Sequence, residues 1–320
     1  MDSGNIGFVL LCAAFVFVMT PGLAMFYGGL VRKKNVVNTM MTSIFIIGVG
    51  IVMWVLFGYS LSFAPSGNAF IGDFRWLGLE GVSLTEGYTD DASIPNMVFS
   101  AFQMMFAVIT PALITGAVAG RMKFKSIFVF TIFWSLIVYY PLAHMVWGQG
   151  GLLGADGIGA LDFAGGDVVH ISSGVSALVL CILLGKRHDY EHSIYRIHNI
   201  PTVVLGASLL MFGWFGFNAG SALAADGLAA HAFMTTGVSA AAAMLSWMLC
   251  DVIKNKKPTL IGASTGMVAG LVGITPGAGF VPMWAAVIIG LTTSPVCYIM
   301  ISYGKKKFGF DDALDAFSCH

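Results

Sequence analysis

The chain has 320 residues, of which 57% are hydrophobic and only 10% are charged, and its mean hydropathy is +0.84. This composition excludes a water-soluble globular domain and predicts an all-α, polytopic membrane bundle. The formal net charge is zero, and the sequence has no basic tail suited to nucleic acid, so we expect no nucleic-acid partner.

Apolar runs recur along the chain, each near the length that crosses a bilayer. Nine are complete, and a tenth begins near Ala313. The first lacks a basic flank and is too long for the core of a signal peptide, so it predicts a retained membrane helix. The nine runs cover residues 6–30, 36–64, 94–120, 126–145, 163–185, 200–218, 228–250, 260–275 and 281–303.

Lysine and arginine residues mark every second junction between these runs. Fifteen of the sixteen basic residues lie there, and only Arg75 lies at an opposite junction. Because basic loops stay in the cytoplasm, the pattern predicts a multi-pass protein of the cell membrane with its N-terminus outside. The five basic clusters lie within residues 32–34, 121–125, 186–196, 254–257 and 305–307.

Two segments each place a histidine eight residues after an aspartate: Asp162 with His170, and Asp312 with His320. If each helix starts near its aspartate, both imidazoles lie about 12 Å along it, near the bilayer midplane. An odd number of helices separates the two halves, so the second half is inverted, and the echo predicts an inverted repeat. We expect one transmembrane domain, residues 1–320, made of repeats at about 6–185 and 200–320.

An ionisable side chain inside an apolar helix is costly, which makes His170 and His320 functional candidates. One alternative is a polar side chain hydrogen-bonded within the bundle. Another is a pair of metal or haem ligands in a membrane enzyme or electron carrier. No further paired histidine lies at that depth, and the five cysteines lack metal-ligand spacing. We therefore expect no metal, no cofactor and no enzymatic activity.

Aromatic side chains gather at the predicted outer ends of three runs. Phe102 and Phe106 are spaced to share one helix face, and Trp147 lies in the outer loop that follows the fourth run. Near the outer end of the sixth run lie Trp214, Phe217, Asn218 and Ser221. Each alone is typical of packing or of an interfacial belt. Together they offer π faces and one hydroxyl, which suit a small cation that is losing its water. The charged lining expected for a metal-ion or anion path is absent.

Asp162 precedes the fifth run and has two interpretations. Its carboxylate could bind a cation directly, or it could cap the helix that follows. We favour the structural role, in which the charge adds negative potential near the pore mouth.

Six stretches form a combined signature: MTPGLAMFYGGLVRKKNV, AFQMMFAVITPALITGA, PLAHMVWGQGGLL, ALDFAGGDVVHI, GWFGFNAGS and DDALDAFSCH. They closely resemble the ammonium transporter family (Amt/Mep/Rh), above all its bacterial and archaeal Amt branch. The resemblance implies eleven helices, about nine and a half of them present here, with a pseudo-twofold axis between helices 1–5 and 6–10. It also implies a homotrimer for nitrogen uptake, with ammonium or methylammonium as substrate and a cytoplasmic PII-type regulator.

The resemblance further implies the roles of individual residues. Phe106, Trp147 and Ser221 would form the external ammonium site. Phe106 and Phe217 would stack as the gate of the pore. These roles would place capture of the cation at the outer mouth of the protein.

Below the gate, the resemblance makes His170 and His320 the twin pore histidines and Asp162 a structural carboxylate. An apolar pore favours separating the proton from ammonia, because a bare cation in hydrocarbon costs many kcal/mol. Neutral imidazoles can relay that proton, and potassium has none to lose. The alternative function is an ammonium sensor, in which the same pore regulates an attached or cytoplasmic signalling partner.

The tenth run reaches His320 at mid-membrane depth, where a helix end would leave carbonyl groups unsatisfied in hydrocarbon. We therefore expect these residues to be a truncated product or one segment of a longer chain. We also expect no transport from them alone.

Overall fold

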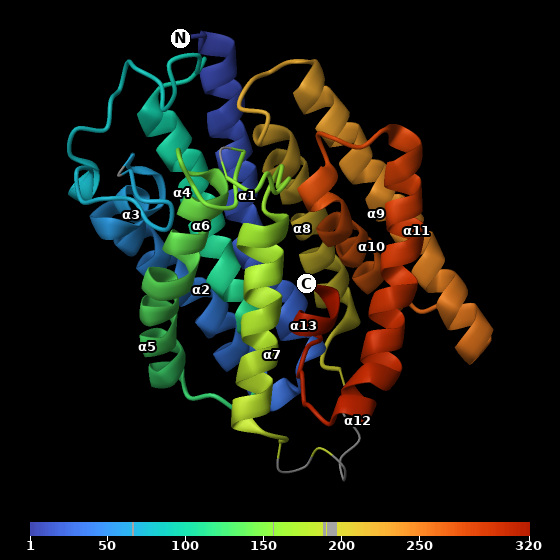
Figure 1. The fold of residues 1–320 in the computed structure, drawn as a ribbon. Helices are drawn as coiled ribbons and strands as arrows, with labels where there is room; N and C mark the ends of the chain where they lie inside the picture. Colours follow the sequence, from blue (N-terminus) through green and yellow to red (C-terminus); the bar gives the residue numbers. More distant parts are fainter. Residues whose placement is uncertain (66, 156, 188–189, 191–196) are drawn as a thin grey trace.

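The computed structural model describes residues 1–65, 67–155, 157–187, 190 and 197–320, so Arg196 of the third basic cluster lies outside the described residues (Figure 1). Within these residues all regular structure is helical. Nine segments of this described part of the chain are long and apolar enough to cross a membrane, which confirms the all-α multi-pass bundle. They are Ser3–Leu30, Lys33–Phe63, Asn96–Ile114, Phe124–Trp147, Gly166–Leu184, Ile200–Gly220, Gly227–Asn255, Leu260–Gly277 and Met283–Phe308.

Several spans are built from more than one helix. Short π-helical turns join α2 to α3, α5 to α6 and α11 to α12, and another opens α7. In the first half, the helices are α1 (Ser3–Leu30), α2 (Val36–Met53), α3 (Tyr59–Phe63), α4 (Asn96–Ile114), α5 (Phe124–Trp134), α6 (Tyr140–Trp147) and α7 (Ser172–Leu184). In the second half, they are α8 (Ile200–Gly220), α9 (Gly227–Asn255), α10 (Leu260–Ile274), α11 (Met283–Ile299), α12 (Lys305–Phe308) and α13 (Ala316–Cys319).

The third span ends earlier than the sequence pattern indicates. Helix α4 stops at Ile114, and residues 115–120 continue as turns. The side chain of Tyr27 reaches across from α1, and its hydroxyl donates to the carbonyl of Leu113 at 2.9 Å. A Cβ atom at Gly116 would lie 2.5 Å from the Tyr27 ring, so a glycine is required where α1 crosses this turn.

Helices α1 and α8, the first of each predicted repeat, pack against each other at the centre of the bundle (Figure 1). Small residues bring the two backbones together. A Cβ atom at Gly206 of α8 would lie 2.3 Å from the backbone nitrogen of Phe26, and one at Gly29 would lie 2.7 Å from that of Val203. This contact fixes the two halves relative to each other.

The spans run alternately in opposite directions, so the junctions that carry basic clusters gather at one end of the bundle. We call this the basic end; the N-terminus lies at the opposite end (Figure 1). Contacts between junctions stabilise it: the N–H of His198 donates to the carbonyl of Val31 at 3.1 Å, and the Arg121 guanidinium donates to that of Gly185 at 2.5 Å.

Candidate functional site

A cavity of about 440 Å³ opens at the end opposite the basic end. All three residues of the predicted external site line it: Phe106 from α4, Trp147 at the end of α6, and Ser221 directly after α8. The structure therefore brings together three side chains that are up to 115 positions apart in the sequence. The cavity also has Asp91 in its lining, so the expectation of a lining without charge is wrong here.

Two of the three side chains are held by neighbouring carbonyl groups. The indole N–H of Trp147 donates to the carbonyl of Asp162 at 3.1 Å. The hydroxyl of Ser221 donates to the carbonyl of Phe217 at 2.9 Å, which leaves its oxygen lone pairs as acceptors. The Trp147 ring stands perpendicular to that of Phe106, with centroids 5.9 Å apart. The cavity thus combines fixed π faces with a hydroxyl acceptor.

Phe106 and Phe217 form a stacked pair at the inner side of this cavity. Their ring centroids are 4.2 Å apart at an interplanar angle of 29°, and both side chains are buried. Phe217 in turn lies 6.2 Å from the ring of His170. The pair therefore lies between the cavity and the histidines, in the place predicted for a gate.

The structure brings His170 and His320 into direct contact. Their Nδ1 atoms are 3.0 Å apart. A neutral imidazole has one donor and one acceptor nitrogen, so the pair shares one hydrogen bond, and either ring can donate it. His170 is buried, and its Nε2 has no hydrogen-bond partner among the described residues. When Nδ1 of His170 donates to His320, this Nε2 is the acceptor nitrogen of the ring.

Trp214, which the sequence placed among the aromatic side chains of the cation site, instead holds the ring of His170 from one side. The two rings stack 5.4 Å apart at 12°, and the indole N–H donates to the hydroxyl of Thr275 at 2.9 Å. A second cavity, of about 140 Å³, is lined by Tyr27, Trp214 and His320. The histidine pair therefore lies between two cavities.

Asp162 is buried, and its carboxylate accepts four backbone N–H groups. Oδ1 accepts from Gly165 and Gly166 at 2.6 and 2.7 Å. Oδ2 accepts from Asp167 and Val168 at 2.8 and 3.2 Å. These donors are the ones that a helix start leaves unpaired. Burial raises the pKa of the Asp162 carboxyl, and the four backbone bonds act against that rise.

The expected start of the histidine helix needs a correction. The helical segment begins at Gly166, four residues after Asp162, with a π-helical turn that ends at Ile171. The carboxylate can reach the first amides only because the chain bends back at Gly165, whose φ of 114° favours glycine. His170 therefore lies within the first turns of the helix, nearer to the helix start than its spacing from Asp162 predicts.

Asp312 repeats this arrangement, although the sequence predicted only that a helix starts near it. Its Oδ1 accepts from the N–H of Ala316 at 3.0 Å, and its Oδ2 from those of Phe317 and Ser318 at 2.9 and 3.4 Å. The helical turn α13 then begins at Ala316, again four residues after the aspartate. The shared spacing to a histidine was the signal that could have identified this second cap.

No cluster of three or more His, Cys, Asp or Glu side chains within residues 1–65, 67–155, 157–187, 190 and 197–320 could hold a metal ion. The arrangement instead combines an aromatic cavity, a stacked phenylalanine pair and a hydrogen-bonded histidine pair. Such a site is suited to binding a small cation and moving its proton.

Comparison with known proteins identifies the family. Residues 7–320 match the sequence model of the Ammonium Transporter Family. An ammonium transporter of Bacillus subtilis is 52% identical over 320 residues, covering 100% of this chain and 78% of the relative. The ammonium transporter Amt1 of Archaeoglobus fulgidus is 42% identical over 320 residues, with the same two coverages.

Solved structures agree. The crystal structure of Saccharomyces cerevisiae Mep2 superimposes with a TM-score of 0.91 at 38% identity, covering 100% of this chain and 71% of that one. A structure titled Sensor Amt Protein superimposes with a TM-score of 0.89 at 28% identity, covering 99% and 79%. The chain is therefore a member of the ammonium transporter family.

Proposed function

We propose that the protein captures ammonium in the cavity lined by Phe106, Trp147 and Ser221, removes its proton, and conducts ammonia past His170 and His320. The observation that carries this proposal is the 3.0 Å contact between the two Nδ1 atoms, placed directly beyond the stacked phenylalanine pair. Membership of the family supports ammonium as the substrate.

Capture depends on replacing part of the hydration shell of the cation. The rings of Phe106 and Trp147 offer their π faces, and a desolvated cation–π contact is worth about 0.5–2 kcal/mol. The oxygen of Ser221 accepts one N–H of ammonium. The carboxylate of Asp91 in the same cavity adds a negative potential that draws cations to the mouth.

Deprotonation follows from the barrier beyond the cavity. Ammonium has a pKa a few units above neutral, so the charged form is the one that arrives. The stacked rings of Phe106 and Phe217 offer no hydration to an intact cation, and transfer of a charge into such surroundings costs many kcal/mol. Neutral ammonia crosses at a far lower cost. Potassium cannot shed its charge in this way, which gives selectivity.

The histidine pair carries the proton. Because the two Nδ1 atoms share one hydrogen bond, a proton accepted at Nε2 of His170 can be passed on as the donor in the pair switches from one ring to the other. Stacking by Trp214 keeps the ring of His170 in the plane that this exchange requires. Neither imidazole needs a fixed charge for the relay.

Replacement of His170 tests the proposal. Made in the full-length protein, His170→Ala removes half of the relay, so we expect the ammonium current in proteoliposomes to fall by at least about tenfold, or potassium to enter. His231→Ala is the matched control, because His231 binds the carbonyl of Val281 away from the pore. An unchanged ammonium current together with unchanged exclusion of potassium in His170→Ala would remove the histidines from the mechanism.

Sensing is the second candidate, because the chain also resembles a protein titled Sensor Amt Protein. The same cavity would then report ammonium to a signalling partner. Reconstitution separates the two functions, since a transporter moves ammonium in liposomes that contain no other protein. The proposed transporter is a single transmembrane domain built from two repeats, and it assembles as a homotrimer. A PII-type regulator docks on its basic end. These three points rest on the family resemblance.

A further inference from the structure

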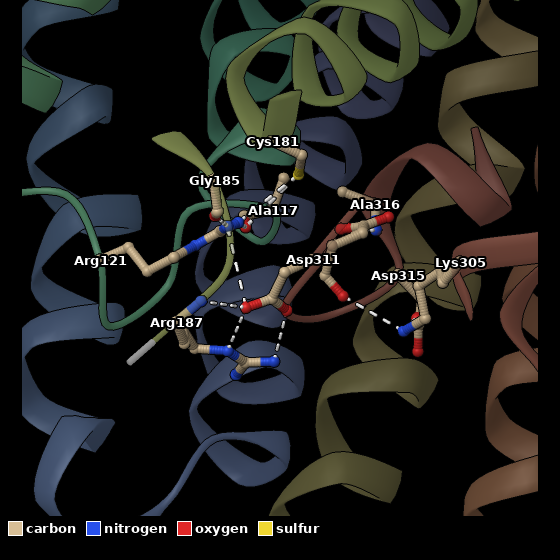
Figure 2. Close-up of polar contacts among 10 residues, drawn as sticks. Ala117, Arg121, Cys181, Gly185, Arg187, Lys305, Asp311, Asp315 and Ala316 are labelled. Carbon is tan, nitrogen blue, oxygen red and sulfur yellow. Dashed lines mark hydrogen bonds and ion pairs between the residues drawn. The ribbon is translucent and has the colours of Figure 1, made fainter. Parts of the chain in front are cut away.

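We propose that Asp311 is a positioning residue for the pore histidines, because its carboxylate fixes the segment that carries His320 against the helix that carries His170. This inference rests on the proposed function. The carboxylate is held by Arg121, from a junction inside the first repeat, and by Arg187, from the junction between the two repeats (Figure 2). We call these three residues the arginine clamp.

Arg187 makes the closest contacts of the arginine clamp. Asp311 is fully buried at the basic end. Its Oδ2 accepts from the backbone N–H of Arg187 at 2.9 Å and from Nε at 2.8 Å, while its Oδ1 accepts from Nη2 at 2.7 Å. A bidentate fork of this kind fixes direction as well as distance, which a single point charge does not.

Arg121 connects the clamp to two further elements. Its Nη1 lies 3.8 Å from Oδ2 of Asp311 and donates to the carbonyl of Gly185 at 2.5 Å. Its Nη2 donates to the carbonyl of Ala117 and contacts Sγ of Cys181 at 3.5 Å. Figure 2 shows Arg121 between these groups and Asp311, with Arg187 on the same carboxylate. The clamp therefore joins the turn after α4, the end of α7 and the segment before α13.

The residues between Asp311 and His320 are also held in place by contacts. Asp312 caps α13, and the ammonium group of Lys305 binds the carbonyl of Asp312 at 3.2 Å and pairs with Asp315 (Figure 2). On the other side, α13 packs on α7 so closely that a Cβ atom at Gly174 would lie 2.8 Å from the carbonyl carbon of His320. The segment is thus held at both flanks.

Helix α7 links the clamp to the histidine contact. His170 lies in the π-helical turn that opens this helix, and Gly185 lies directly after its last residue. Through Arg121, Asp311 therefore holds the C-terminal end of α7, the helix whose opening turn carries His170. The chain from Asp311 itself reaches His320 within nine residues. A contact of 3.0 Å between two ring nitrogens tolerates little displacement.

The experiment compares Asp311→Asn with the wild-type protein in two assays. The variant keeps the shape of the side chain and removes its charge. We expect the ammonium current per reconstituted protein to fall about 10- to 100-fold, as a displacement of about 1 Å at a reacting pair can produce. In protein labelled with ¹⁵N-histidine, the NMR coupling between the two Nδ1 atoms should be lost. Asp311→Glu, which retains the charge, should restore part of both signals.

The matched control is Asp73→Asn, which breaks a bidentate pair with Arg75 on an exposed loop and should change neither assay. If the folded Asp311→Asn protein has wild-type current and wild-type coupling per molecule, the inference is contradicted, even when the yield is reduced. A residue that only stabilises the fold would lower the yield and leave both signals per molecule unchanged. If Asp311→Asn does not fold, Asp311→Asn with Arg187→Gln also removes the guanidinium charge that Asp311 faced, and wild-type coupling in that protein is the contradicting result.

The two proposals fail separately. If His170→Ala leaves current and potassium exclusion unchanged, the relay is wrong, and the ¹⁵N coupling still reports whether Asp311 positions the rings. If His170→Ala abolishes transport and Asp311→Asn does not alter the coupling, the relay stands and the positioning role is wrong.

Discussion

In the cavity lined by Phe106, Trp147 and Ser221, the side chain of Trp147 has a fixed position because two independent contacts hold it. Its N–H is bound to the carbonyl of Asp162, and its ring is set perpendicular to that of Phe106. A side chain fixed in this way loses little entropy when a cation binds, so more of the cation–π energy remains as affinity.

Replacing Trp147 with leucine should therefore weaken capture. Loss of about 0.5–2 kcal/mol of cation–π energy corresponds to a rise of about 2- to 30-fold in the half-saturation concentration for methylammonium uptake. Ser221→Ala should act in the same direction through the lost acceptor. Trp284→Leu is the control, because Trp284 is an exposed residue at the start of α11. Wild-type half-saturation in both Trp147→Leu and Ser221→Ala would show that the cavity does not select the cation.

The sequence alone was sufficient to single out His170 and His320, because an ionisable residue is conspicuous in an apolar run and the spacing to an aspartate repeats. It was not sufficient to predict that Trp214 stacks on His170, or that Asp311 has a role. An aromatic residue in a membrane helix is ordinary, and its stacking on His170 depends on how α8 meets the start of α7. Arg187 and Asp311 are 124 positions apart, and no local pattern pairs them.

Among the elements, the two short histidine-bearing segments share one design. Each begins with a buried aspartate that caps a helical turn starting four residues later, and each reaches its histidine eight residues on. Without the carboxylates, the first amides of both segments would be buried and unpaired. The two segments thus satisfy their first amides in the same way, as the predicted inverted repeat would require.

Asp312 gives this design a dependence on pH. Burial, with a contribution from Asp315 and opposed by Lys305, raises the pKa of its carboxyl to about 6, from about 4 in an unfolded chain. The folded state therefore binds the proton more tightly than the unfolded state between these values. Its contribution to the free energy of unfolding is largest below about pH 4, declines up to about pH 6 and is flat above.

Asp312→Asn should remove that contribution. We expect the change in the midpoint of thermal unfolding in detergent from pH 4 to pH 7 to be less negative, or more positive, in the variant than in the wild-type protein. The control is Asp226→Asn, since Asp226 is an exposed residue whose carboxylate accepts from the amides of Leu228 and Ala229 at the start of α9. Equal pH dependence in wild-type and Asp312→Asn protein would mean that Asp312 does not keep its proton in the fold.

On the scale of the whole molecule, the basic clusters and the aromatic cavity lie at opposite ends of the bundle. The basic clusters mark alternate junctions, and the aromatic cavity opens at the other end. Hydropathy located all nine spans to within a few residues, because length and apolar content determine which segments cross a bilayer. It could not predict the π-helical turns or the early end of α4, which arise from contacts between helices, such as that of Tyr27 with Leu113.

The orientation in the membrane follows from the same charge distribution. Lysine and arginine residues are retained in the cytoplasm, so the basic end should face inward and the cavity outward. A cysteine placed at Thr85, on an exposed loop near the cavity, should react with a membrane-impermeant maleimide in intact cells. A cysteine at Lys257, which is exposed at the basic end, should react only after the membrane is permeabilised. The protein without an added cysteine gives the background from its own thiols, of which Cys12, Cys181 and Cys297 are buried. Labelling of Lys257→Cys, and not of Thr85→Cys, in intact cells would invert the topology and place the ammonium cavity on the cytoplasmic side.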